Sequence, residues 1–205
     1  MVAIIDYGVG NLFSLFSSFS AIGFEATITR DPEVIRKADR ILLPGVGAFS
    51  DAIAKLRETG LIPVILDEVS KGKPLLGICL GMQLLFEKSF EYGEYEGLGL
   101  IPGEIRPISD VISPDLKIPH IGWNALHFSD KKSEIFKYLS ESDCVYFVHS
   151  YYGSGCDEYV TATAEYSADL TAAVQNENVY GCQFHPEKSG DVGLKILRAF
   201  CELER

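Results

Sequence analysis

One cysteine of this chain lies in a sequence context that could make it a nucleophile. Cys79 is the centre of a Gly-x-Cys-x-Gly motif, from Gly77 to Gly81, directly after the apolar run Pro74–Ile78. Such glycines permit a sharp strand-to-helix turn with the central side chain exposed. The N-terminus of the next helix favours a thiolate, and the Leu80 N–H is placed to bind an oxyanion. Taken alone, the motif also fits a small buried cysteine in a tight turn.

A base and an acid for this thiol follow the last expected strand. His185 and Glu187 flank Pro186, and in an extended segment residues two apart point to the same side. His185 could take the thiol proton and return it to a leaving amine, while Glu187 would orient the imidazole. The alternative is a surface turn with incidental charges, which the cysteine motif disfavours. Together the segments predict a cysteine hydrolase with a Cys-His-Glu triad.

A third glycine-rich segment, Leu43–Phe49, also follows an expected strand. Its glycines would let a backbone amide turn toward a ligand, so Val46 and Gly47 are candidates for a second oxyanion donor. The same glycines also fit an ordinary tight turn before a helix. The segment lacks the Gly-Lys-Ser/Thr of a Walker loop.

The elements that must position these motifs alternate between short β-branched runs and helical segments in the first half of the chain. This alternation predicts an α/β fold with an open, mixed, largely parallel sheet flanked by helices. The second half predicts shorter strands, some of them antiparallel additions to the sheet edge. The expected strands are 2–6, 40–43, 74–78, 101–108, 117–126, 144–149, 160–165, 171–175 and 179–184. The expected helices are 11–22, one after Phe49, one from about Pro63, and a last one capped by Ser189 with Val192, Ile196, Ala199 and Phe200 on its buried face.

Composition limits the class of protein. The chain has 205 residues and 47% hydrophobic residues, which predicts a single domain over residues 1–205. A formal charge of −11 opposes nucleic-acid binding. No apolar run approaches the roughly 18 residues of a membrane span, and no signal segment is visible, so we expect a cytosolic protein. Five cysteines without a CxxC pair disfavour a metal site or a disulfide framework.

The three glycine- and histidine-containing segments resemble the class I glutamine amidotransferases over essentially the whole chain. The resemblance implies a flavodoxin-like fold, L-glutamine as substrate and no cofactor. It assigns Cys79 as nucleophile, His185 as base and Glu187 as its orienting acid. It also places Gly47 and Gln83 at glutamine-binding positions. The backbone of His149-Ser150-Tyr151 would hold the substrate's α-amino and α-carboxylate groups, although His149 alone would more often be a packed histidine.

Within this family the chain resembles the glutaminase subunits of imidazole glycerol phosphate synthases. Four segments carry the likeness: 6–12, 44–49, 120–124 and 185–189. The likeness implies a heterodimer with a (β/α)8-barrel cyclase subunit, which would use the ammonia in histidine biosynthesis. Trp123 lies in a polar, glycine-containing segment and is a candidate interface anchor, with a core tryptophan as the alternative. Asn11 and Lys188 are candidates for relaying partner contact to the site.

Two other functions stay open at this point. A stand-alone γ-glutamyl cysteine hydrolase would use the same triad, and a non-catalytic partner-binding subunit would keep only the fold. A mobile donor in the 44–47 loop could make hydrolysis slow until a partner docks. The segment 90–99, rich in acids and glycine, is expected to be a solvated loop rather than a lid.

Overall fold

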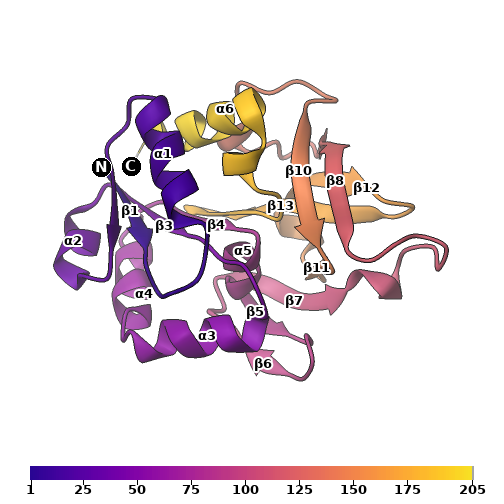
Figure 1. Cartoon of the computed structure of the whole chain (residues 1–205), viewed down its shortest axis with the longest axis horizontal. Coiled ribbons are helices and arrows are strands. Elements are labelled where there is room, and N and C mark those ends of the chain that lie inside the picture. Colours follow the sequence, from indigo (N-terminus) through magenta and orange to yellow (C-terminus); the bar gives the residue numbers. More distant parts are fainter. Residues whose placement is uncertain (205) are drawn as a thin grey trace.

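A computed structural model describes residues 1–204. Its centre is an eight-stranded sheet with the order β2-β1-β3-β4-β14-β13-β12-β9 (Figure 1). The first five strands in this order are parallel, and the last three join antiparallel at one edge. The predicted open, largely parallel α/β sheet is therefore confirmed. The strands are β1 (Val2–Ile5), β2 (Ala26–Thr29), β3 (Arg40–Leu43), β4 (Leu75–Ile78), β9 (His127–Phe128), β12 (Val160–Glu165), β13 (Asp169–Asn176) and β14 (Val179–Cys182).

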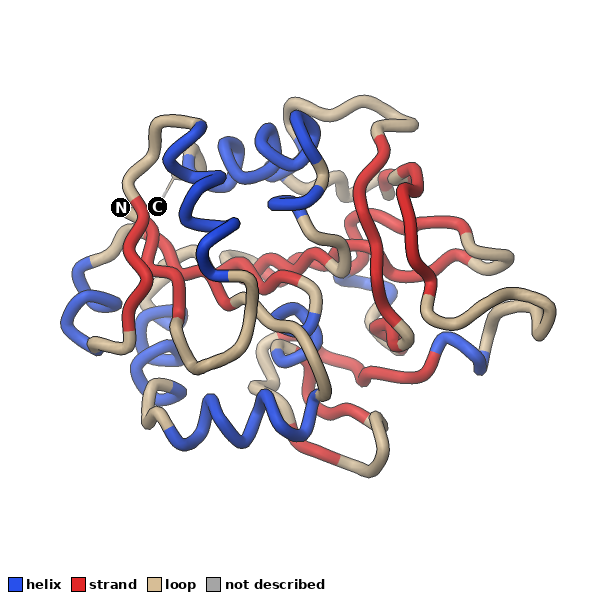
Figure 2. The backbone as a smooth tube through the Cα atoms, viewed as in Figure 1, coloured by secondary structure: helices blue, strands red, loops and turns tan. Residues whose placement is uncertain are grey.

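Helices cover both faces of this sheet (Figures 1 and 2). The first strand shows why: Ala3 and Ile5 belong to one core cluster, and Val2 and Ile4 to the other. Successive side chains of a strand point to opposite faces, so a strand buried on both faces is apolar throughout. One face packs against α1 (Leu12–Ala21) and α6 (Gly190–Cys201). The other packs against α2 (Pro32–Lys37), α3 (Phe49–Glu58), α4 (Ile62–Ser70) and α5 (Leu80–Leu84).

Two smaller sheets lie outside the main sheet. An antiparallel pair joins β8 (His120–Ala125) to β10 (Cys144–His149). A second sheet has the order β11-β7-β5-β6, from Tyr151–Ser154, Ile101–Pro107, Phe86–Ser89 and Tyr95–Glu96. Four 3-10 turns lie at Ile108–Asp110 (η1), Glu134–Phe136 (η2), Asp157–Tyr159 (η3) and Pro186–Lys188 (η4). Strands β7, β8 and β10 thus extend separate sheets rather than the edge of the main one.

Several element boundaries differ from the sequence-based expectation. The strand expected from Lys117 begins only at His120, because Pro119 has no N–H to donate to a ladder. Ser189 holds the position before α6, but its hydroxyl makes no cap bond. It donates to the His185 carbonyl and accepts from the Tyr146 N–H instead. The short elements β2, α2, β5, β6, β9 and β11 were not expected.

The structure also bears on membrane association. Within residues 1–204, no helix combines the length and the apolar character that a membrane crossing requires.

Candidate active site

Cys79 occupies the turn between β4 and α5, as the motif predicts. Its backbone has φ 53° and ψ −113°, a conformation that residues with a side chain rarely adopt. The Cys79 N–H donates to the Cys182 carbonyl at 2.7 Å, which ties the turn to β14. The flanking glycines are required because a Cβ on Gly77 would lie 2.7 Å from the Gly81 carbonyl oxygen, and a Cβ on Gly81 would overlap the Leu43 carbonyl.

His185 and Glu187 form a buried pair beside this turn. The Nδ1 atom of His185 lies 2.8 Å from Oε1 of Glu187, and the two side chains are 3% and 2% exposed. The His185 N–H donates to the Tyr146 carbonyl at 3.0 Å, which attaches the segment to β10. Burial lowers the pKa of His185, but hydrogen bonds with Cys79 and Glu187 outweigh it and raise the pKa to about 9. The imidazole therefore carries a proton at neutral pH, as a general acid must.

A cavity of about 280 Å³ opens over the cysteine, near the lower end of the usual range for small-molecule sites. The structure brings ten of the residues singled out in the sequence to its wall, from four separate segments. Those ten are Val46, Gly47, Cys79, Leu80, Gln83, His149, Ser150, Tyr151, His185 and Lys188, and they are joined by Glu91, Pro119 and Val148. Glu187 lies behind His185 rather than in the wall.

The cavity contains charged groups of both signs apart from His185. Glu91 is the acid, and Lys188 is the base. Oε2 of Glu91 accepts a hydrogen bond of 2.6 Å from the Phe49 N–H at the start of α3. Burial raises the pKa of Glu91, against that hydrogen bond. A zwitterionic amino acid would match this pair of charges.

Segment 90–99 is not only a solvated loop, because it also contains a short strand and a residue of the cavity wall. Tyr92 is 85% exposed, as expected of a loop. Tyr95 and Glu96, however, form β6 and pair with β5, and Glu91 belongs to the cavity wall. The composition of the segment carried no signal for either role.

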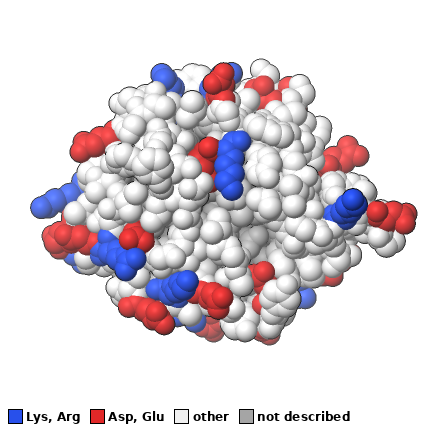
Figure 3. Space-filling model, in the orientation of Figure 1, with Lys and Arg blue, Asp and Glu red and all other residues white. Residues whose placement is uncertain are grey.

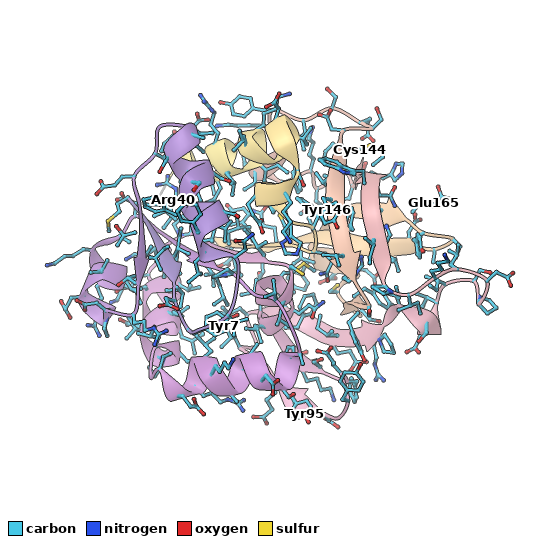
Figure 4. The ribbon with its side chains drawn as sticks, viewed as in Figure 1. Tyr7, Arg40, Tyr95, Cys144, Tyr146 and Glu165 are labelled. Carbon is cyan, nitrogen blue, oxygen red and sulfur yellow. The ribbon has the colours of Figure 1, made fainter. Side chains whose placement is uncertain are left out.

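The 44–47 loop is held from two sides. The hydroxyl of Tyr7, which lies between β1 and α1 in the chain (Figure 4), donates to the Pro44 carbonyl at 2.6 Å. On the other side Gly45 packs so closely on the elbow that a Cβ would lie 2.6 Å from the Gly81 nitrogen. Gly47 has φ +99°, and Val46 is 42% exposed. The middle of the loop is thus the part with room to change its backbone conformation.

His149 is the packed histidine that its position alone suggested, although it also lines the cavity. Its Nδ1 lies 2.9 Å from the Tyr151 carbonyl, and its Nε2 lies 3.0 Å from Nδ1 of His120. Because a carbonyl only accepts, His149 carries its proton on Nδ1, and His120 must donate to the bare Nε2. Burial lowers the pKa of His149 to about 4. Both ring nitrogens are occupied, so the segment offers a ligand its backbone rather than this imidazole.

The three interface candidates lie in different surroundings. Trp123 is 58% exposed on β8, so the alternative of a core tryptophan is wrong. Its ring centre lies 6.1 Å from that of Tyr146. Tyr146 belongs to the neighbouring strand β10 (Figure 4). Lys188 reaches the cavity wall, whereas Asn11 precedes α1 without a side-chain cap bond and lies outside that wall.

Besides the wall residues Pro119 and Val148, three polar residues close to the site were missed in the sequence. Glu91, His120 and Gln183 reach it through contacts with residues distant in the chain. Only Gln183 carried a usable signal, because it stands two residues before His185 in a segment expected to be extended.

Comparison with known proteins identifies the family. Residues 3–202 match the family model described as glutamine amidotransferase class-I. The chain is 50% identical over 202 residues to the imidazole glycerol phosphate synthase subunit HisH of Lactococcus lactis subsp. lactis (strain IL1403), with 98% of each chain covered. It is also 50% identical to the subunit of that name from Aquifex aeolicus (strain VF5), covering 96% of this chain and 94% of the relative.

Solved structures agree with the fold. A crystal structure of a glutamine amidotransferase superposes with a TM-score of 0.76 at 20% identity, covering 98% of both chains. The structure of PurLQS from Thermotoga maritima gives a TM-score of 0.74 at 19% identity, covering 98% of this chain and 96% of that one. This chain therefore belongs to the class-I glutamine amidotransferases and, within them, to the HisH subunits of imidazole glycerol phosphate synthase.

Proposed function

We propose that this chain hydrolyses L-glutamine at Cys79, His185 and Glu187 and passes the ammonia to a synthase subunit. The observation that carries the assignment is the buried His185–Glu187 pair, 2.8 Å apart, beside a cysteine in a strained strand-to-helix turn. The pair, the turn and a small cavity with charges of both signs together suit hydrolysis of a free amino acid amide.

The reaction proceeds through a thioester. The Cys79 thiolate attacks the side-chain carbonyl carbon of glutamine, and the oxyanion forms against the Leu80 N–H and one N–H of the Val46–Gly47 peptide. As the C–N bond breaks, His185 gives its proton to the leaving nitrogen, which departs as ammonia. Water, deprotonated by the now neutral His185, then attacks the γ-glutamyl thioester. Glutamate leaves, and the thiolate and imidazolium are restored.

Substrate orientation follows from the charges in the cavity wall. We place the α-ammonium of glutamine at Glu91 and its α-carboxylate near Lys188 and the backbone of Ser150 and Tyr151. Charge-assisted hydrogen bonds of this kind are short and strong in a partly desolvated site. The amide end would then extend toward Cys79, where the triad acts.

The partner we propose is a (β/α)8-barrel cyclase that forms a heterodimer with this chain. It would combine the ammonia with a phosphoribulosyl formimino aminoimidazole carboxamide ribonucleotide. The products would be imidazole glycerol phosphate and an aminoimidazole carboxamide ribonucleotide. The names of the relatives support a multisubunit enzyme. The centre of the face in Figure 3 carries few charged side chains and lies between α1 and β8, which bear exposed Phe13 and Trp123.

The decisive experiment measures glutamate release from glutamine by the purified chain, alone and with a barrel cyclase and its ribonucleotide. We expect strong stimulation by the loaded partner and loss of activity in Cys79→Ala. Cys144→Ala is the matched control, because Cys144 is an exposed free thiol. Full activity without the partner, or preferential cleavage of γ-glutamyl peptides, would instead identify a stand-alone hydrolase. Activity that survives in Cys79→Ala would refute the triad.

A further inference from the structure

Gln183 is a fully buried polar side chain next to the nucleophile. It follows β14 and is 0% exposed. Its Nε2 donates to the Sγ atom of Cys79 at 3.7 Å, and its Oε1 accepts from Nε2 of Gln83 at 3.0 Å. Burying an amide is costly unless both of its ends are hydrogen-bonded. Gln183 meets that condition by bridging the cysteine and a residue of the cavity wall.

The orientation of the Gln183 amide follows from its neighbours. Nε2 of Gln83 also lies 3.4 Å from the Tyr151 carbonyl oxygen, which can only accept. Gln83 must therefore turn its NH₂ group toward Tyr151 and Gln183, so Gln183 meets it with an oxygen. The NH₂ group of Gln183 is then left facing Cys79, where an N–H is the group that stabilises a thiolate.

The Tyr151 carbonyl is itself held in place. It accepts a second hydrogen bond, of 2.9 Å, from Nδ1 of His149. The bonds from His149 to Cys79 thus form one continuous chain through Tyr151, Gln83 and Gln183, and each link fixes the direction of the next. Both hydrogens of Gln83 are used inside this chain, so its carbonyl oxygen is the part that remains for a ligand.

We propose that Gln183 is a further member of the catalytic group: it donates a hydrogen bond to the Cys79 thiolate and directs the Gln83 carbonyl oxygen toward the substrate. The proposal rests on the proposed role of Cys79 as nucleophile. A sulfur anion bound by one imidazolium and one amide N–H is held in one position for attack. As the new S–C bond forms, the negative charge moves from the sulfur to the substrate oxygen. The Gln183 bond then weakens, and no proton is transferred through the amide.

The test compares Gln183→Met and Gln183→Glu. Methionine keeps the length of the side chain without an N–H or a C=O. Glutamate keeps an oxygen for Gln83 and places a second oxygen against the sulfur. Because glutamate has the same shape as glutamine, Gln183→Glu can be tested even if Gln183→Met fails to fold. Gln175→Met is the matched control, because Gln175 lies on the adjacent β13 and its amide bonds only the Glu177 carbonyl among the bonds described for residues 1–204.

The first readout is the pH dependence of Cys79 alkylation by iodoacetamide, in a Cys144→Ser background that removes the exposed thiol. We expect the midpoint of alkylation to move up by about one pH unit in both Gln183 variants, since a hydrogen bond to a charged group contributes on the order of a tenfold change in equilibrium. The control Gln175→Met should not change this midpoint. A role in packing alone would lower the melting temperature without moving this midpoint.

The second readout is turnover of glutamine. We expect kcat to fall roughly tenfold or more in Gln183→Met, with a smaller fall in the affinity for glutamine. An unmoved alkylation midpoint in both Gln183 variants would overturn the proposal even if the chain is an active glutaminase. Conversely, the midpoint could move although the chain does not hydrolyse glutamine. That result would support the hydrogen bond between Gln183 and Cys79 and refute only the proposed function.

Discussion

The phenolic oxygen of Tyr7 lies 2.6 Å from the backbone carbonyl oxygen of Pro44 and donates a hydrogen bond to it. Tyr7 is 3% exposed, so this bond is made in the interior. It joins the segment after β1 to the loop that carries the proposed second oxyanion donor. A change in the backbone of the 44–47 loop must therefore break or move the hydrogen bond to Tyr7.

Replacing Tyr7 with phenylalanine should loosen the 44–47 loop. The Pro44 carbonyl would lose its buried donor, which lowers the free energy of unfolding by about 1–2 kcal/mol. Hydrogen exchange of the amides from Gly45 to Ala48 should become faster, because the loop is held at fewer points. Tyr92→Phe is the control, since Tyr92 is 85% exposed. Unchanged exchange in Tyr7→Phe would show that the bond does not restrain the loop.

Replacing Glu187 with glutamine should change the pH dependence of hydrolysis. The pKa of His185 is about 9, and the Glu187 carboxylate contributes to raising it. Above that pH the imidazolium loses the proton that the leaving ammonia needs, so kcat/KM should fall through about pH 9 in the wild type. In Glu187→Gln the falling limb should move to lower pH, and kcat should drop roughly 10²-fold or more.

The matched control for this profile is Glu94→Gln. Glu94 is exposed and pairs with Lys88 at the surface. Its replacement should leave both limbs of the profile in place. If the falling limb in Glu187→Gln coincided with that of the wild type, the carboxylate would not set the proton affinity of His185.

Replacing Glu91 with glutamine should weaken substrate binding through the α-ammonium. The variant keeps an oxygen for the Phe49 N–H but loses the negative charge, so we expect KM for glutamine to rise about tenfold or more with a smaller change in kcat. The measurement is repeated with 5-amino-5-oxopentanoate, which lacks the α-amino group. KM for that compound should not respond to the substitution. An equal rise for both compounds would place the α-ammonium elsewhere.

The buried His149 should make the fold less stable in acid. Its pKa is about 4 in the folded chain, against an ordinary value of 6.5. Between these values the unfolded chain binds the proton and the folded chain does not, so stability is complete above about pH 6.5 and falls toward pH 4. From pH 7 to pH 5 this one group should cost about 2 kcal/mol of the free energy of unfolding.

Urea unfolding of the wild type and His149→Asn at the two pH values tests this expectation. From pH 7 to pH 5, the free energy of unfolding of His149→Asn should fall by about 2 kcal/mol less than that of the wild type. His127→Asn is the control, because His127 is exposed on β9. Parallel losses in the wild type and His149→Asn would mean that the His149 proton does not destabilise the fold.

Trp123 should be an anchor of the proposed heterodimer. Trp123→Ala should weaken binding of the barrel cyclase by about thirtyfold or more, roughly 2 kcal/mol, as for other buried aromatic anchors. The melting temperature of the isolated chain should hardly change, because the side chain is 58% exposed there. Titration calorimetry measures the affinity, with Tyr138→Ala, 45% exposed near Glu202, as the control. Equal affinities for the two variants would exclude Trp123 as an anchor.

The sequence by itself determined the features that are local or periodic. The strand, tight turn and helix around Cys79 follow from an apolar run and two glycines within a few residues. The spacing of His185 and Glu187 places them on one side of a short segment, whatever surrounds it. The alternation of apolar runs and helical periodicity also indicated the parallel sheet, because the hydrophobic pattern of each element shows which of its faces is buried.

Only the tertiary structure decided which distant residues complete the cavity and which polar groups are paired. Glu91 meets Phe49 across 42 positions, His149 meets His120 across 29, and Gln183 meets Cys79 across 104. Such contacts have no period and no neighbouring residue that reveals them. They depend on how separate sheets pack at the ends of β4 and β14, and packing is set by the whole set of side chains at once. For the same physical reason, the exposure of Trp123 followed from the place of β8 outside the main sheet rather than from its residue type.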